Sequence, residues 1–266
     1  GVHCMMILFI ICLIASTVGA VAGFGGGVII KPVMDALGLL PVSTISFLSG
    51  CTVFSMSVSS LIKNRNDGVK LDIKKSTPLA MGAILGGIIG KAMFQYVRNH
   101  FENENVLGFV QAIFLVGITI GVFIYVLKKN SMKSYHIDST LLCIVIGTVL
   151  GIISSFLGIG GGTSNVAMLF FFFSMNAKEA AKNSIYIIMF SQIASIIIAV
   201  VNNTVPHFEL VQLIAMASGG VGGALIGAII SKKLNNELIE KLLRVMLAIV
   251  ICINFYNVVK FGTHIF

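Results

Sequence analysis

Long apolar stretches alternate with short polar ones along the chain. A membrane-spanning helix needs about 20 mostly apolar residues. Stretches of this kind lie near 2–22, 42–62, 76–97, 105–127, 139–157, 183–201, 208–230 and 239–259. Two shorter apolar stretches, near 24–40 and 159–175, follow runs of glycine, and short spans, re-entrant hairpins and halves of broken helices all remain open for them. The pattern predicts an all-α, polytopic membrane protein of about 8–10 transmembrane segments.

The chain also contains an internal repeat. The run Gly23–Gly27 recurs as Gly158–Gly162, 135 residues later. The same offset superposes Ser49–Ser60 on Ser184–Ser195. Three glycines spaced four residues apart recur at an offset of 137 residues, Gly82, Gly86 and Gly90 matching Gly219, Gly223 and Gly227. Three matched blocks in the same order predict two copies of one membrane unit, 1–130 and 131–266.

Basic residues are distributed differently in the two copies. The stretch 63–75 carries five Lys or Arg residues, whereas the equivalent 201–209 carries none. Conversely, 98–104 has one arginine against two glutamates, while its partner 232–244 has four basic residues. Because Lys and Arg mark cytoplasmic loops, equivalent loops of the two copies are expected on opposite sides of the membrane. We therefore predict inverted copies of five crossings each with both termini outside; parallel copies are the alternative.

Composition and charge narrow the class further. The 266 residues are 57% hydrophobic and 11% charged, with a mean hydropathy of +1.01, whereas soluble domains are about 25% charged. This excludes a cytosolic enzyme, a secreted disulfide scaffold and a disordered regulator. The net charge of +8 lies mostly in loops, which indicates membrane orientation and no nucleic-acid partner. Five scattered cysteines without a C-x-x-C motif indicate neither disulfides nor a metal site, and no cofactor is expected.

The two glycine runs are candidates for a substrate site. Consecutive glycines inside an apolar segment sacrifice helix propensity and free backbone N–H groups, which are costly in lipid unless they face protein or a water-filled cavity. A helix that starts after such a run can direct its N–H groups at an anion. Close helix packing through small residues is the alternative, and it is favoured for the glycines spaced four apart. We predict a site between the copies lined by Gly25, Gly26, Gly27, Gly160, Gly161 and Gly162.

The paired G-x-G-G-G elements, the following Pro32, the Ser/Thr-rich next helix and the duplication resemble the TauE/SafE family over essentially the whole chain. The resemblance implies a membrane transporter, not an enzyme, that exports sulfite, sulfoacetate or related small organosulfur anions. Lys31 before Pro32, and Ala167 where the second copy would repeat the proline, depart from the family pattern. The resemblance therefore supports the broad function and does not select one anion.

Uncharged polar side chains in the spans suit a small anion, because hydroxyls and amides donate hydrogen bonds without carrying a fixed charge. The equivalent pair Ser49 and Ser184 is expected to bind the substrate, together with Asn183, Ser164 and Asn165. Hydrogen bonds from such hydroxyls to carbonyls of their own helix are the alternative.

Two lysines lie inside apolar stretches, where charge is costly. Lys31 follows the first glycine run and is a candidate cation for the site, but an i,i+4 ion pair with Asp35 is equally open. Lys91 lies near a segment end and is expected to extend its amine towards the interface.

The function expected from these features is a secondary carrier for a small sulfur-containing anion in the bacterial cytoplasmic (inner) membrane. Inverted repeats with glycine-interrupted helices are typical of secondary transporters, and no Walker A motif for direct use of ATP is present. An anion channel and an uptake carrier are the alternatives, and a membrane-embedded enzyme is disfavoured. The expected partners are the anion and the lipid bilayer, with a homo-oligomer left open.

Overall fold

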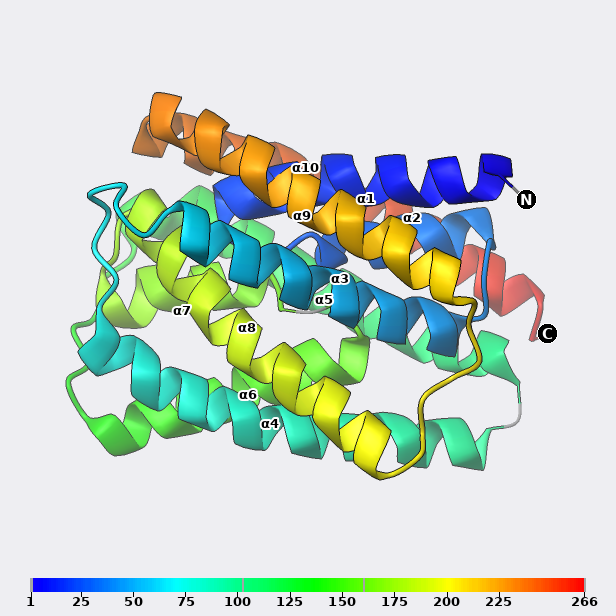
Figure 1. Cartoon of the computed structure of the whole chain (residues 1–266). Helices are drawn as coiled ribbons and strands as arrows, with labels where there is room; N and C mark the ends of the chain where they lie inside the picture. Colours follow the sequence, from blue (N-terminus) through cyan, green and yellow to red (C-terminus); the bar gives the residue numbers. More distant parts are fainter. Residues whose placement is uncertain (1, 102, 160, 266) are drawn as a thin grey trace.

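The computed structural model describes residues 2–101, 103–159 and 161–265, and within these ranges it contains helices and no strands (Figure 1). Its long helices are α1 (Val2–Ala22), α3 (Val42–Lys63), α4 (Ile73–His100), α5 (Glu104–Lys128), α6 (Thr140–Leu157), α8 (Ala177–Val201), α9 (Leu210–Lys233) and α10 (Asn236–Thr263). All eight are long and apolar enough to cross a membrane, so the eight predicted spans are confirmed as helices. Three shorter elements are α2 (Gly27–Leu37), α7 (Thr163–Phe173) and the 3-10 turn η1 (Lys129–Ser131).

Short polar sequences set the helix ends. Asn176 and Glu179 form a capping box at the start of α8, in which the Glu179 N–H donates to Asn176 Oδ1 at 3.0 Å. Gly38 and Gly158 end α2 and α6 in the left-handed conformation, which glycine adopts without steric cost. These signals act within one turn and define the residue at which each of these helices begins or ends.

The distribution of polarity is that of a protein dissolved in lipid. Large apolar side chains point outwards along the long helices, for example Met81, Leu85 and Ile89 on α4. Polar side chains such as Thr52 and Gln111 are instead buried between helices. A water-soluble protein avoids a continuous exposed apolar surface of this kind. The chain is therefore an integral membrane protein.

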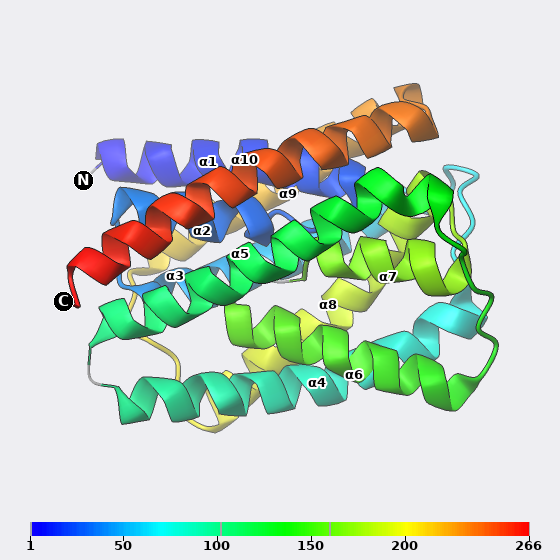
Figure 2. The same cartoon turned by 180° about the vertical axis from the view of Figure 1, so that it is seen from behind.

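The helices of the first half pack against helices of the second half (Figures 1 and 2). The most extensive contacts join α4 to α6 and α1 to α9, followed by α3 with α9, α4 with α8, α5 with α10 and α3 with α8. Exchanging each helix with its repeat partner (α1 with α6, α3 with α8, α4 with α9, α5 with α10) maps this set of contacts onto itself. The stretches 1–130 and 131–266 are thus interlocked and do not form separate lobes.

The glycines spaced four apart explain the closest of these contacts. A Cβ on Gly90 would lie 2.6 Å from the Ile152 carbonyl oxygen on α6, and one on Gly227 would lie 2.8 Å from the Thr17 carbonyl oxygen on α1. Gly82, Gly86, Gly219 and Gly223 meet carbonyl oxygens of the same two helices. The packing interpretation of these glycines is confirmed, and the neighbours in the two sets are related by the offset of 135 residues.

The connections gather at two ends of the bundle (Figure 1). The links from α3 to α4, from α5 to α6 and from α9 to α10 lie at one end, together with their basic residues. The links from α2 to α3 and from α8 to α9 lie at the other end, beside the start of α1 and the end of α10. Residues 63–75 and 201–209, which occupy equivalent places in the repeat, are therefore at opposite ends of the molecule.

Candidate functional site

The two glycine runs form turns between a long and a short helix. The first run joins α1 to α2 and the second joins α6 to α7. Four of the glycines have positive φ, which side chains rarely adopt: Gly23 (82°), Gly25 (70°), Gly158 (63°) and Gly161 (111°). Gly160, one of the predicted site residues, lies outside the described residues. The glycines are thus required by the backbone geometry of both turns.

The two runs meet in the interior of the bundle. A Cβ on Gly27 would overlap the carbonyl oxygen of Ile159 in the second run. A Cβ on Gly26 would lie 2.8 Å from Ser16 Oγ, and one on Gly161 would overlap an isoleucine side chain of α8. Protein atoms therefore occupy the space next to these glycines in this conformation, and the runs bring backbones of the two halves together.

The equivalent serines Ser49 and Ser184 differ in their hydrogen bonds. Both are fully buried. Ser184 Oγ donates to the carbonyl oxygen of Gly23 at 2.6 Å, which ties α8 to the first glycine run. Ser49 Oγ is buried without a partner among the described residues. Of these two serines, only Ser49 has a hydroxyl for which the fold provides no hydrogen-bond partner among the described residues.

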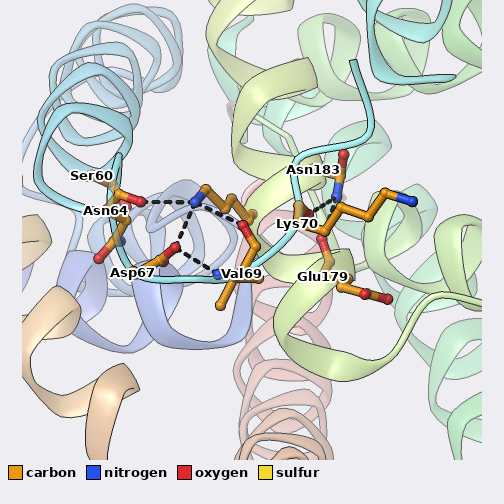
Figure 3. Close-up of polar contacts among 8 residues, drawn as sticks. Ser60, Asn64, Asp67, Val69, Lys70, Glu179 and Asn183 are labelled. Atoms are coloured by element: carbon orange, nitrogen blue, oxygen red, sulfur yellow. Dashed lines mark hydrogen bonds and ion pairs between the residues drawn. The ribbon is translucent and has the colours of Figure 1, made fainter. Parts of the chain in front are cut away.

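Asn183 is engaged by the link between α3 and α4 (Figure 3). Its Oδ1 accepts from Ser76 Oγ at 2.5 Å and from the Asp72 N–H at 3.0 Å. Its amide nitrogen donates to the carbonyl oxygens of Lys70 at 3.2 Å and Glu179 at 2.7 Å. In this conformation the whole amide group positions the link against α8, so it has no donor left for a substrate.

The neighbouring Lys182 was not singled out from the sequence, yet it is central to this network. Its amine lies 2.6 Å from Asp67 Oδ1 and donates to the carbonyl oxygens of Asn64 at 2.8 Å and Val69 at 3.1 Å (Figure 3). Lys182 stands one position before the apolar stretch 183–201, so a hydropathy pattern assigns it to a loop. The signal in the sequence that could have drawn attention to Lys182 is the repeat, in which it is equivalent to Phe47 at the offset of 135.

The start of α7 places the remaining uncharged candidates. Gly162 precedes the helix, and its carbonyl oxygen accepts from the Asn165 N–H at 3.0 Å. Ser164 and Asn165 are both buried in the first turn. Asn165 Oδ1 has no hydrogen-bond partner among the described residues. The second glycine run therefore leads directly into a polar, interior helix start.

The alternatives for Lys31 are separated by the structure. Its amine lies 2.5 Å from Asp35 Oδ2, and both side chains are buried. Lys260 of α10 donates to the Asp35 carbonyl oxygen at 2.7 Å, and Asn257 donates to that of Pro32 at 2.9 Å. The i,i+4 ion pair is present within α2, and the bonds from Asn257 and Lys260 fasten α2 to α10.

Two small interior clefts occupy repeat-equivalent places. The Lys91 cleft, of about 10 Å³, is lined among others by Ser46, Phe47, Gly50, Lys91, Ser155 and Ser195. The Lys182 cleft, of about 20 Å³, is lined among others by Ala20, Ser60, Asp67, Ala181, Lys182 and Ile185. The offset of 135 relates six positions of one cleft to six of the other. Each cleft has room for about one water molecule.

Wider hollows lie at the two ends of the bundle, and two of them are also repeat-equivalent. One, of about 170 Å³, includes Lys70, Asp72, Lys75, Met175 and Glu179, and the other, of about 350 Å³, includes His207, Glu209, Gln212, Leu40 and Thr44. Beside the first lies a hollow of about 800 Å³ whose charged lining is three lysines against two aspartates. The hollow at the opposite end has one arginine against two glutamates. The two ends therefore differ in charge.

Comparison with known proteins agrees with this architecture. The family model described as "Sulfite exporter TauE/SafE" matches residues 8–254. A protein of Methanocaldococcus jannaschii described as a "probable membrane transporter protein" is 24% identical over 212 residues, which cover 74% of this chain and 73% of the relative. No solved structure matches the chain. The family match covers both glycine runs and nearly every helix, and the chain belongs to the TauE/SafE family of membrane transporters.

Proposed function

We propose that this transporter is a secondary carrier that exports small sulfur-containing anions, such as sulfite, sulfoacetate or related sulfonates, across the cytoplasmic membrane by alternating access. The observation that carries the proposal is the pairing of cavities. The two inner clefts are repeat-equivalent to each other, and so are one outer hollow at the basic end and the outer hollow at the opposite end. Two inverted halves supply two nearly equivalent gates around one central site. Movement of one set of helices against the other would then open the site to one end at a time.

The charge of the outer hollows supports export of an anion. The basic loops mark one end as cytoplasmic by the positive-inside rule. The hollow of about 800 Å³ at that end carries three lysines against two aspartates, and a lining of net positive charge raises the local concentration of an anion. The hollow at the other end includes Glu104 and Glu209, which favour release. A membrane potential of 100 mV, negative inside, favours exit of each negative charge by about 2.3 kcal/mol.

Transport in proteoliposomes tests this proposal. Vesicles loaded with radiolabelled sulfite or sulfoacetate should show saturable efflux that a negative internal potential accelerates. Unlabelled anion on the opposite side should stimulate efflux of the labelled anion, because a carrier reorients faster when it is occupied. Sulfate, thiosulfate and taurine in the same assay define the substrate range. Currents that do not saturate would indicate a channel, and absence of movement for all these anions would refute the proposal.

A further inference from the structure

Lys91 is a buried cation without a counter-ion among the described residues. Its side chain is 7% exposed, and no described carboxylate lies within 4.0 Å of the amine. This separates it from Lys31, which is buried in an ion pair with Asp35, and from the half-buried Lys182, which pairs with Asp67. An unpaired charge inside a membrane protein is costly and indicates a functional role.

Its position on α4 argues against an amine that reaches the membrane surface. Helix α4 runs from Ile73 to His100, so Lys91 lies nine residues before its end. Nine residues correspond to about 13 Å along the helix axis, at about 1.5 Å per residue. The amine instead points between two aromatic rings, with its Nζ 4.8 Å from the ring centre of Phe94 and 6.0 Å from that of Phe47. Lys91 is therefore held inside the bundle.

The groups around Lys91 are donors that the fold does not use. Ser46 Oγ and Ser155 Oγ line the same cleft, and both are buried without a hydrogen-bond partner among the described residues. Gln192 also lines the cleft, but its Nε2 already donates to Ser154 Oγ at 3.0 Å. Unsatisfied buried polar groups are rare in folded proteins and call for an explanation. An ammonium group and two hydroxyls that face one cavity are suited to the oxygens of a small anion.

The repeat makes this cleft chemically distinct from its counterpart. The positions equivalent to Ser46, Ser155 and Lys91 are Ala181, Ala20 and Ala228. The counterpart cleft also has its lysine neutralised by Asp67. An unpaired positive charge with free hydroxyls thus occurs in only one of the two clefts.

We propose that Lys91, Ser46 and Ser155 bind the sulfur oxygens of the transported anion in the Lys91 cleft; this rests on the proposed function. Phe47 and Phe94 provide an apolar wall for the carbon part of an organic sulfonate. At about 10 Å³ the cleft is closed in this conformation. The anion enters when α3 and α4 separate from α6 and α8, which is the same movement that alternating access requires.

Binding to the full-length protein in nanodiscs tests this site. Sodium sulfite and sodium sulfoacetate are titrated at constant ionic strength and followed by calorimetry and by the shift in Tm. Lys91→Gln should weaken the binding of both anions by about tenfold or more, which is the scale of one hydrogen bond to a charged group. Lys91→Arg keeps the charge and should retain binding within about threefold, and Ser155→Ala should weaken it by about fivefold. The matched control is Lys63→Gln, which removes an exposed lysine at the end of α3 and should bind like the wild type.

The outcomes distinguish this inference from the function on which it rests. Wild-type affinity in Lys91→Gln, in a protein that still transports sulfite, would overturn the site and leave the carrier intact. A wild type that neither binds nor transports these anions would refute both. If Lys91→Gln does not fold, the binding measured for Lys91→Arg and Ser155→Ala tests the site. Unchanged binding in Ser155→Ala, or lost binding in a folded Lys91→Arg, would then contradict the proposal.

Discussion

At the residue scale, the structure divides the buried polar groups into those that hold the fold and those that it leaves unused. Ser184 and Asn183 belong to the first group, because each bonds to a segment of the other half of the chain. Lys31 is also in this group, through its i,i+4 ion pair with Asp35 within α2. Ser49 and Asn165 belong to the second group. Of the predicted binding residues, these last two have the groups available for a ligand.

The two equivalent serines should respond differently to the same substitution. Ser184→Ala removes the donor to the Gly23 carbonyl, a buried group that then lacks a partner, and should lower the free energy of unfolding by about 1–2 kcal/mol. Ser49→Ala removes a hydroxyl that is already without a partner and should leave stability nearly unchanged. Unfolding of both variants in bicelles with SDS measures the difference. Equal losses, or a larger loss for Ser49→Ala, would contradict this assignment.

At the scale of the elements, glycine sets how closely the helices approach. A Cβ on Gly86 of α4 would overlap the Thr148 carbonyl oxygen of α6, whereas a Cβ on Gly117 of α5 would meet no atom within 4 Å. Alanine is favoured over glycine inside a helix by about 1 kcal/mol. Gly117→Ala should therefore be neutral or stabilising, while Gly86→Ala should lower Tm because the α4–α6 contact has to open. If both variants had wild-type Tm values, close glycine packing would not stabilise this contact.

The elements themselves were predictable because their signals are local. Hydropathy over one span predicted every long helix, and the glycine runs predicted the breaks before α2 and α7. The start of α8 was missed by six residues, since it begins at Ala177 and not near 183. Lys178, Glu179 and Lys182 make the first two turns polar. The capping box holds Glu179 and residues 64–69 hold Lys182, and only the second of these depends on the folded chain.

The binding groups were less predictable, because their contacts are long-range and not local. No sequence pattern shows that Ser184 reaches Gly23 while its equivalent Ser49 stays unpaired, because the contact joins residues 161 positions apart. Lys91 was expected to reach the membrane interface, yet the rings of Phe47 and Phe94 hold it inside. Which polar group remains unused is decided by long-range packing.

At the scale of the whole molecule, the repeat accounts for both the interlocked halves and the paired cavities. Because α4 packs on α6 and α9 packs on α1, each of these two extensive contacts joins a helix of one half to a helix of the other. The Lys182 cleft is closed at the basic end by the link between α3 and α4, which Lys182 and Asn183 fasten to α8. The equivalent Lys91 cleft has Phe47 where Lys182 stands in its counterpart. The lining of the Lys182 cleft is thus polar and ionic at this position, and that of the Lys91 cleft is aromatic.

The inversion predicted from the charge pattern can be tested by the sidedness of two links. Asn66 and Asn202 are exposed in equivalent links at opposite ends of the bundle. In a background whose five free cysteines are replaced by alanine, Asn66→Cys and Asn202→Cys each offer one thiol. A membrane-impermeant maleimide should label Asn202→Cys in intact cells and Asn66→Cys only after permeabilisation, because the positive-inside rule predicts that the basic link is cytoplasmic. Labelling of both from the same side would mean parallel copies, and it would remove the basis for two opposed gates.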